Sequence, residues 1–349
     1  MTVSVAYVLA AGLGTRLRPL TSVRCKPLVE VCGTPLIAFT LRLLQDAGIK
    51  RVGINSHWLH PQLPETLGNK WGSLELTFTH EPEVLGTGGG LRGLVQALPP
   101  PPGERVLVMN ADALIDIDMR ALLATPADAL ATLVLQTTAD VAKYGAIGTD
   151  DDERITSFAG RIEPIGAVAR ERMFCGVHLV HPRAFDILPE VALDHASAPH
   201  AVVRGPQSGI NDEGYPVWLR RGVLMRGFDL AGTFCDVGTP ERLLAANLAV
   251  LDGSWSSTHL RPFADLVEYP GRVFVSKDAS VAGQVRGPVL VGAGAIIEKR
   301  AVVERSVVGA NTLVMANARV KDSVLHKGTR VSGEVIREIA WSNGTMQVS

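Results

Sequence analysis

The 349-residue sequence has little of several features that define common protein classes. Its four cysteines are too few and too scattered for a disulfide framework, and none forms the CxxC pair typical of thiolate zinc sites. Lys and Arg total 34 against 35 Asp and Glu, so the basic excess that favours general nucleic-acid or anionic-membrane binding is absent. We therefore expect any phosphate binding to come from a local site.

Long apolar segments and targeting signals are also missing. No window approaches the roughly 18 apolar residues of a membrane span. The apolar N-terminus has no basic region before it and runs into a glycine turn, unlike a signal peptide. We expect a cytoplasmic protein without a membrane partner. The HxxH pairs His57/His60 and His178/His181 lack the acidic partner of metalloproteases, so we expect no zinc site.

The sequence does have enough hydrophobic residues to form more than one apolar core. Hydrophobic residues make up 46% of the chain, and its length predicts about two domains at roughly 150 residues each. In the first part, apolar strand-like runs alternate with helical patterns: strands at 3–9, 51–55, 74–79 and 105–109, helices at 35–47 and 88–98. This alternation predicts an α/β fold with a doubly wound, mostly parallel, Rossmann-like sheet, which binds ligands at the carboxyl ends of its strands.

The pattern changes after residue 253. Small aliphatic residues then recur about every six positions, at Val291, Ile297, Val303, Val308, Val314, Val320, Leu325 and Val331. This period is typical of hexapeptide repeats, and we expect a short left-handed parallel β-helix, with ordinary antiparallel strands as the alternative. The predicted domains are a catalytic domain at 1–253, a linker at 254–270, the β-helix at 271–337 and a tail at 338–349.

The most informative segment is the glycine turn that follows the first strand. The turn consists of Gly12-Leu13-Gly14-Thr15-Arg16, and Lys26-Pro27 follows after a short gap. Glycines after a buried strand let backbone N–H groups approach a phosphate chain, and Arg and Lys add charge for its oxygens. The segment is neither GxGxxG nor GxxxxGK[ST], so it indicates neither a dinucleotide fold nor a P-loop.

This combination resembles the signature of the sugar-1-phosphate nucleotidyltransferases, in which Lys-Pro is usually preceded by a Pro that Cys25 replaces here. Further segments extend the resemblance over nearly the whole chain: Leu85-Gly86-Thr87 resembles the nucleobase loop, Asn110-Ala111-Asp112 the strand-end Gly-Asp, and Asp236-Val237-Gly238 the late metal-binding segment. The family therefore implies a Mg²⁺ cofactor, with an NTP and a sugar 1-phosphate as substrates.

The resemblance assigns a role to each matching residue. It implies catalytic roles for Arg16, Lys26 and Asp112, and metal ligation by Asp112 and Asp236. It implies nucleotide binding by Leu9, Ala11, Gly12, Gly14, Thr15, Glu81, Gly86 and Thr87, and sugar-phosphate binding by Gly145 and Glu163. Hard carboxylate oxygens suit Mg²⁺, which typically takes one or two carboxylates plus substrate phosphates.

The sugar side departs from the family pattern. Many members carry Glu-Lys-Pro, whereas this chain has Glu163-Pro164 without the Lys. Arg161, Arg170 and Arg172 are the candidates for the missing cation, and the sequence does not choose among them.

The resemblance predicts transfer of a nucleotidyl group from an NTP to a sugar 1-phosphate, with GTP and mannose 1-phosphate favoured as substrates. The alternatives are uridylyl transfer to N-acetylmuramate or hexose 1-phosphate, guanylyl transfer to heptose 1-phosphate, a catalytically silent nucleotide-sugar-binding regulator, and a bifunctional enzyme with an acyltransferase β-helix. We expect the β-helix to mediate homo-oligomerisation or to pack on the catalytic domain.

Overall fold

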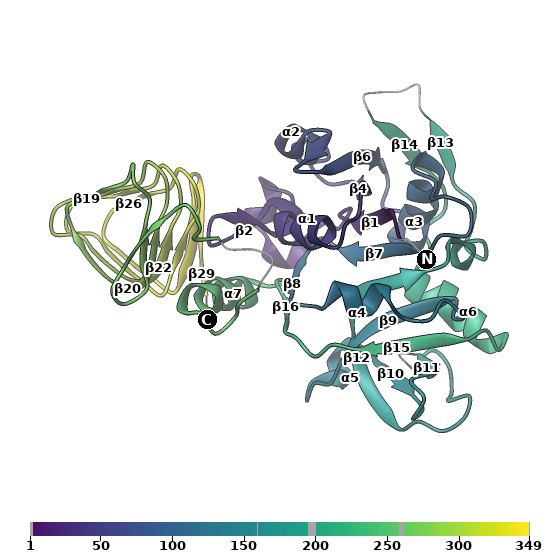
Figure 1. Cartoon of the computed structure of the whole chain (residues 1–349). Helices are drawn as coiled ribbons and strands as arrows, with labels where there is room; N and C mark the ends of the chain where they lie inside the picture. The colour runs from purple at the N-terminus through teal and green to yellow at the C-terminus, as the bar shows by residue number, and fades with distance from the viewer. Residues whose placement is uncertain (1–2, 159, 195–199, 258–261, 349) are drawn as a thin grey trace. The chain divides into compact units, whose positions relative to one another are not determined.

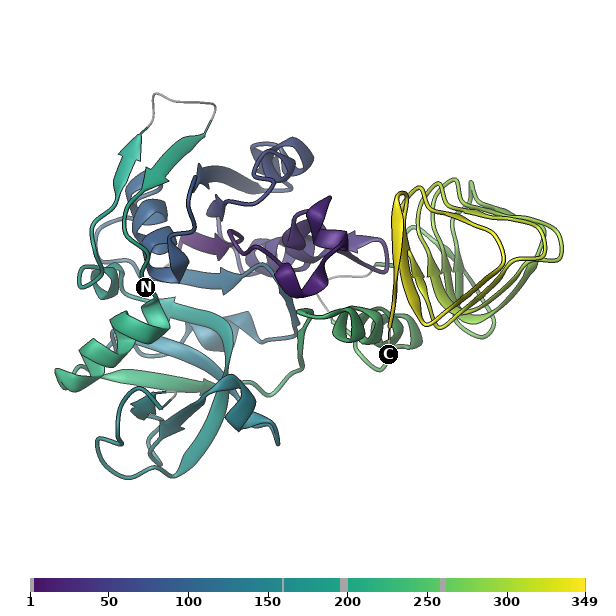
Figure 2. The ribbon, with the colours of Figure 1, turned by 180° about the vertical axis from the view of Figure 1, so that it is seen from behind.

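A computed structural model describes residues 3–158, 160–194, 200–257 and 262–348 (Figures 1 and 2). Contacts divide the chain into two compact units. The first comprises Met1–Leu13, Thr40–Ala111 and Ile117–Phe234. The second comprises Gly14–Phe39, Asp112–Asp116 and Cys235–Ser349. No helix in the described ranges is long and apolar enough to cross a membrane.

The first unit is built on one mixed sheet whose main strand order is β11-β10-β12-β7-β1-β4-β6-β14-β13, with β9 and β15 beyond β12 and β5 beside β6. Its strands are β1 (Val5–Leu9), β4 (Arg51–Ser56), β5 (Lys70–Trp71), β6 (Leu74–His80), β7 (Val106–Asn110), β9 (Ala131–Gln136), β10 (Ala146–Thr149), β11 (Ile155–Phe158), β12 (Arg170–Val180), β13 (Ala192–Asp194), β14 (Ala201–Arg204) and β15 (Met225–Asp229). Its helices are α2 (Gln62–Leu67), α3 (Gly86–Ala97), α4 (Met119–Leu123), α5 (Val141–Tyr144) and α6 (Tyr215–Arg220). Helix α1 (Leu36–Asp46) begins in the second unit and ends in the first.

The predicted parallel core is present at the centre of this sheet. β7, β1, β4, β6 and β14 run parallel, because helices and longer loops connect strands that point the same way. The expectation of a mostly parallel sheet fails at the flanks, where β12 pairs antiparallel with β7, β9 and β10. There the short charged turn Asp150–Glu153 joins β10 to β11, and such a short connection permits only an antiparallel hairpin.

The second unit contains short segments from early in the chain and the whole C-terminal region. It holds β2 (Glu30–Val31), β3 (Thr34–Pro35), β8 (Ala113–Ile115), β16 (Phe234–Asp236) and α7 (Pro240–Asp252). The C-terminal strands are β17 (Val267–Tyr269), β18 (Val273–Val275), β19 (Ser280–Val281), β20 (Gln284–Val291), β21 (Ile296–Ile297), β22 (Val302–Val308), β23 (Leu313–Val314), β24 (Arg319–Lys321), β25 (Val324–Leu325), β26 (Arg330–Val331), β27 (Glu334–Ile336), β28 (Glu338–Trp341) and β29 (Gly344–Gln347).

Residues 273–341 form successive coils whose strands pair in parallel, and we name them the C-terminal stack (Figure 1). All eight aliphatic residues of the predicted repeat are buried in one cluster inside the stack. The period of about six therefore identified the inward positions correctly, and the parallel pairing excludes the antiparallel alternative for these strands. The left-handed sense of the coil stays a prediction.

A second apolar cluster joins the outside of the C-terminal stack to the rest of this unit. Leu290, Val307, Val324 and Ile339 of the stack share it with Leu243 of α7 and with residues of the segment Leu17–Phe39. Asn247 of α7, which is fully buried, reinforces this packing by accepting a hydrogen bond from the Cys32 backbone N–H at 2.8 Å. The stack is therefore packed against the segment that carries Arg16 and Lys26.

These contacts do not follow the predicted domain boundaries. Residues expected in a separate catalytic domain, Gly14–Phe39 and Asp112–Asp116, group with the C-terminal stack. The predicted tail contains β28, which belongs to the stack and buries Ile339 fully, and β29, which pairs antiparallel with β28. The predicted linker contains β17. The sequence pattern marks where the repeat begins, but it carries no signal for which earlier segments pack on the outside of the coils.

The first unit buries a histidine whose titration should shape its stability. His178 of β12 is 2% exposed, and its Nδ1 forms a hydrogen bond with the hydroxyl of Tyr215. Burial lowers the pKa of His178 from 6.5 to about 3, so the folded protein keeps the ring neutral where the unfolded chain would bind a proton. This contribution to stability is complete above pH 6.5 and is lost as the pH falls toward 3.

We predict that acidification from pH 7 to pH 5 reduces the free energy of unfolding through His178 by about 2 kcal/mol. His178→Phe removes this titration, so its free energy of unfolding should fall less steeply over the same range. Urea unfolding at several pH values measures both slopes. Parallel curves, displaced by a constant amount, would contradict the assignment.

Candidate active site

The glycine turn opens the candidate site at the carboxyl end of β1. Gly14 has a φ of +61°, and a Cβ there would lie 3.1 Å from the Thr21 side chain and 3.2 Å from Lys26 Cβ. Thr21 Oγ1 also donates to the Gly14 carbonyl at 2.7 Å. The second unit thus requires glycine at this position both for its left-handed backbone and for close approach to Lys26. A Cβ at Gly12, in the first unit, would meet no atom within 4 Å, so open space lies beside that residue.

Lys26 lies at the start of a tight turn in the second unit and is 7% exposed. The turn is closed by hydrogen bonds from Leu28 N to the Cys25 carbonyl at 2.9 Å and from Val29 N to the Lys26 carbonyl at 3.0 Å. Lys26 Nζ donates to Asp112 Oδ2 at 2.7 Å. The structure therefore brings together two of the three predicted catalytic residues, although 86 positions separate them in the chain.

The third predicted catalytic residue, Arg16, lies beside the second predicted metal ligand. A Cβ at Gly238 would be 2.7 Å from Arg16 Nη2 and 2.8 Å from Asp236 Oδ1, so both groups flank this glycine closely. Asp236 Oδ2 accepts a hydrogen bond from Nη1 of Arg242, which lies on α7. Thr15 and Arg16 are exposed, as expected of residues that bind a ligand from solvent.

The two aspartates have a donor set that fits Mg²⁺. Asp112 directly precedes β8 and Asp236 ends β16, and these two strands pair in a small sheet of their own. Lys26 occupies one oxygen of Asp112 and Arg242 one oxygen of Asp236. Among the described residues, the other oxygen of each carboxylate has no hydrogen bond or ion pair, which leaves one hard ligand per residue. No group of three or more His, Cys, Asp or Glu side chains in the described ranges could hold a metal by itself, so substrate phosphates would have to complete the coordination.

In the first unit, a relay of hydrogen bonds links the glycine turn to the predicted nucleobase loop. Asn55, at the carboxyl end of β4, accepts from Ala10 N at 2.7 Å and donates to Glu81 Oε1 at 2.7 Å. Glu81 Oε2 accepts from Leu85 N at 3.0 Å. Burial raises the pKa of Glu81, against the lowering effect of these hydrogen bonds. Both oxygens of the fully buried Glu81 are thus occupied, one by the Asn55 side chain and one by the Leu85 backbone, and its reading of a nucleobase stays a prediction.

The predicted nucleobase loop is held by a distant segment of the same unit. Gly86 has a φ of +71°, and a Cβ there would lie 2.4 Å from the Ser208 carbonyl oxygen. That carbonyl accepts from Gly88 N at 2.8 Å, and Thr87 Oγ1 accepts from Ile210 N at 3.1 Å. The side chain of Thr87 therefore fixes the loop from inside. These residues form the first turn of α3 rather than a loop, and their glycines let the backbone approach its neighbours closely.

The predicted sugar-phosphate residues lie in the first unit at the β10–β12 flank. Gly145 directly follows α5 with a φ of +82°, and Tyr144, the last residue of α5, is 41% exposed. Glu163 is exposed and makes no hydrogen bond or ion pair with any described residue. Among the described residues no hydrogen bond joins Glu163 to Gly145, and the roles of both stay predictions.

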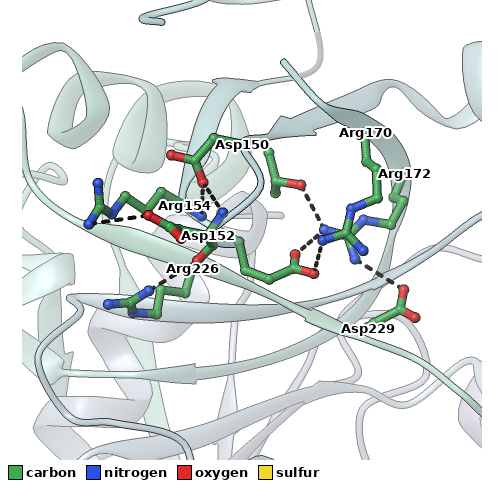
Figure 3. A network of polar contacts seen from close by, with 9 residues as sticks. Asp150, Asp152, Arg154, Arg170, Arg172, Arg226 and Asp229 are labelled. Carbon is green, nitrogen blue, oxygen red and sulfur yellow. Dashed lines mark hydrogen bonds and ion pairs between the residues drawn. The ribbon is translucent and has the colours of Figure 1, made fainter. Parts of the chain in front are cut away.

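Each of the three candidate arginines has an acidic partner. Figure 3 shows the network around Arg170 and Arg172. Arg172 is fully buried, and it donates to Asp229 at 3.0 Å, to Thr149 at 2.8 Å and to Glu153. Arg170 pairs with Glu153, and Arg161 pairs with Asp212.

Arg172 has no exposed surface to offer a ligand, and it joins β12, β10 and β15 within the sheet. Its place in the network is structural, which removes it as the cation for a sugar phosphate. Arg161 and Arg170 both have about half of their side chains exposed, so each stays a candidate for that cation.

Two residues of this arrangement were not predicted. Asn55 ends a buried strand with a polar side chain that is 2% exposed, and a buried polar residue at a strand end could have marked it. Arg242 lies in the first turn of α7, three positions after Thr239, whose hydroxyl caps the helix by accepting from Arg242 N. That sequence predicts a helix start, but only the fold shows that the Arg242 side chain turns back to Asp236.

Known proteins of similar sequence are nucleotidyltransferases that act on several sugar phosphates. The mannose-1-phosphate guanylyltransferase of Mycobacterium tuberculosis is 26% identical over 95% of this chain and 82% of its own. The UTP–glucose-1-phosphate uridylyltransferase of Synechocystis is 23% identical over 92% of this chain and 86% of its own. The N-acetylmuramate α-1-phosphate uridylyltransferase of Neisseria meningitidis is 41% identical over 34% of this chain and 52% of its own.

Comparison with solved structures supports the fold. The crystal structure of HddC from Yersinia pseudotuberculosis superposes with a TM-score of 0.54, at 21% identity, and covers 70% of this chain and 98% of HddC. A family model described as nucleotidyl transferase matches residues 5–253, more than half of the chain. This chain belongs to the nucleotidyl transferase family.

Proposed function

We propose that this protein transfers a nucleotidyl group from an NTP to a sugar 1-phosphate, which forms an NDP-sugar and releases pyrophosphate. The observation that carries the proposal is the arrangement in the second unit, where Lys26 is bound to Asp112 and Arg16 lies beside Asp236. The site has two cationic side chains and two carboxylates, and each carboxylate keeps one oxygen that accepts no hydrogen bond among the described residues. This set suits a polyphosphate substrate bound together with a divalent metal. Membership of the nucleotidyl transferase family supports the same reaction class.

The chemistry needs positioning and charge neutralisation more than a protein nucleophile. An oxygen of the sugar 1-phosphate attacks the α-phosphorus, the bond to the bridging oxygen breaks, and pyrophosphate leaves with the electron pair. The attacking oxygen is already anionic, so no general base is required. In this proposal Arg16 binds the leaving pyrophosphate, and Lys26 binds oxygens of the α-phosphate. Mg²⁺, held by Asp112 and Asp236, would supply further charge neutralisation.

The ion pairs of the free protein also have a function in this proposal. Lys26 and Asp112 neutralise each other before substrate binds, which stabilises the ammonium group of the buried Lys26 without a ligand. Arg242 does the same for Asp236. In this proposal an NTP would replace these pairs: Lys26 would bind phosphate oxygens, and Asp112 and Asp236 would hold the metal.

For the substrates, we propose GTP and mannose 1-phosphate as the first candidates. Mannose-1-phosphate guanylyltransferases match this chain over nearly its whole length, including the C-terminal stack. A second candidate pair is UTP with N-acetylmuramate 1-phosphate, because the 41% identity to the Neisseria enzyme over 120 residues is the higher local similarity. Cytoplasmic location and self-association through the stack are also part of the proposal and rest on the sequence alone.

Pyrophosphate release from a panel of substrates tests the reaction and its specificity. We predict that the protein with Mg²⁺ releases pyrophosphate from GTP only when a sugar 1-phosphate is present, with mannose 1-phosphate the best acceptor. UTP, dTTP, CTP and ATP with glucose, N-acetylmuramate and heptose 1-phosphates complete the panel. Faster turnover with UTP and N-acetylmuramate 1-phosphate would replace the first candidate by the second. Release with none of the pairs would refute the proposed reaction.

The metal assignment predicts that Asp112→Asn and Asp236→Asn each lower kcat/KM by at least about 100-fold, since a bound metal contributes several kcal/mol and about 1.4 kcal/mol is tenfold. Each change removes one charge but keeps the shape of the side chain. Asp151→Asn is the matched control, because Asp151 is an exposed aspartate in the Asp150–Glu153 turn, and it should leave the rate within about twofold of the unmodified protein. Wild-type rates in both site variants would exclude the proposed ligands.

A further inference from the structure

The turn that presents Lys26 is closed at its base by a charge contact. Arg24 Nη1 donates to Glu30 Oε1 at 2.8 Å, and these two residues bracket the turn on either side of Lys26. Lys26 at the start of the turn reaches Asp112. The position of the Lys26 ammonium group therefore depends on how firmly Glu30 is held.

The other oxygen of Glu30 faces a histidine from the C-terminal stack. His326 follows β25 and is 2% exposed, and its Nδ1 lies 3.7 Å from Glu30 Oε2. In both views of the ribbon β2, which begins at Glu30, lies next to the stack (Figures 1 and 2). Burial by itself raises the pKa of Glu30, but His326 and Arg24 together outweigh burial and lower it. The imidazole thus helps to keep a largely buried carboxylate charged.

The backbone of His326 is fixed by neighbouring coils. His326 N donates to the Ala340 carbonyl at 2.7 Å, and the His326 carbonyl accepts from Thr312 Oγ1 at 3.2 Å and from Thr329 Oγ1 at 2.5 Å. Thr312 and Thr329 are themselves buried. The ring is therefore carried by a rigid part of the stack rather than by a surface loop.

The second ring nitrogen indicates which atom carries the proton. Nε2 of His326 is buried and has no hydrogen-bond partner among the described residues. A buried N–H without a partner costs more free energy than a buried lone pair in this position, so the proton belongs on Nδ1, toward Glu30. The Nδ1–H is therefore the group that faces Glu30 Oε2, in a polar contact of 3.7 Å that is longer than a hydrogen bond.

We propose that His326 is a positioning residue for nucleotidyl transfer, which acts from the C-terminal stack through Glu30 on the turn that carries Lys26. The inference rests on the proposed function only for its effect on turnover, because the geometry of the turn can be measured without substrate. It gives the stack a part in the reaction beyond support or self-association. Both apolar packing and this polar contact would then join the stack to the phosphate-binding segment.

The test compares two substitutions at one position. His326→Asn keeps an N–H donor close to the place of Nδ1, whereas His326→Leu fills similar space without a donor. We expect His326→Leu to lower kcat/KM by about 10-fold, the smaller end of the range for residues that orient a site, and His326→Asn to stay within about threefold of the unmodified protein. Glu30→Gln should lower kcat/KM similarly, and combining it with His326→Leu should add little, because residues in one network are not additive.

Acylation of Lys26 by an amine-reactive reagent, followed by mass spectrometry, measures how accessible the Lys26 amine is in the substrate-free protein. Lys26 should react several times faster in His326→Leu than in the unmodified protein or His326→Asn, while the exposed Lys50 reacts at the same rate in all three. If no substrate pair in the panel is turned over, the proposed function fails, and this labelling still decides the inference.

Val314→Ala is the matched control for general damage to the stack. Val314 is fully buried inside the coils, in a cluster separate from the one shared with the Lys26 segment. It should lower the melting temperature without changing Lys26 labelling. The inference is overturned if Val314→Ala lowers kcat/KM and speeds Lys26 labelling as much as His326→Leu does. Unchanged Lys26 labelling in His326→Leu would overturn it as well.

Discussion

The candidate phosphate site depends on one constraint, which is that its charged groups must be held rigidly although they come from distant parts of the chain. Lys26 and Asp236 lie on, and Asp112 directly precedes, very short elements that could not fold alone. The shared apolar core of the second unit provides the rigidity, because α7 and the outside of the C-terminal stack pack on the segment that carries Arg16 and Lys26. The two ion pairs then fix the carboxylates within that frame.

The first unit solves a different problem with a different kind of interaction. Its candidate nucleobase-binding segment is held by polar side chains. Asn55 and Glu81 form a hydrogen bond with each other, and each also accepts one from a backbone N–H. Such a buried network is stable only when each polar group has its hydrogen-bond partner. A side chain at a neighbouring glycine would collide with these groups, so the network needs glycine there. At the β10–β12 flank the buried Arg172 also stabilises the sheet by hydrogen bonds. From β12 it donates to the Asp229 carboxylate on β15 and to the Thr149 hydroxyl on β10.

Much of this could be predicted from the sequence where a pattern has a physical period or a sharp backbone requirement. The alternating strands and helices predicted the parallel centre of the sheet, and the period of six placed eight inward residues of the stack correctly. Gly14 was predicted at a tight turn, and it has the left-handed backbone that such a turn needs. The contacts that depend on tertiary packing could not be predicted. No local pattern shows that Arg242 turns back to Asp236, that Arg172 is buried among acids, or that His326 faces Glu30 across nearly 300 positions of sequence.

The central claim is that the α-phosphorus of an NTP is transferred to a sugar 1-phosphate. The most direct measurement follows radiolabel from GTP carrying it on either the α- or the γ-phosphate, in the presence of Mg²⁺ and mannose 1-phosphate. The account predicts that the α-label appears in a sugar nucleotide and the γ-label in pyrophosphate, in equal amounts. Transfer of the γ-label to the sugar, or release of the α-label as free nucleotide with the sugar phosphate unchanged, would contradict it.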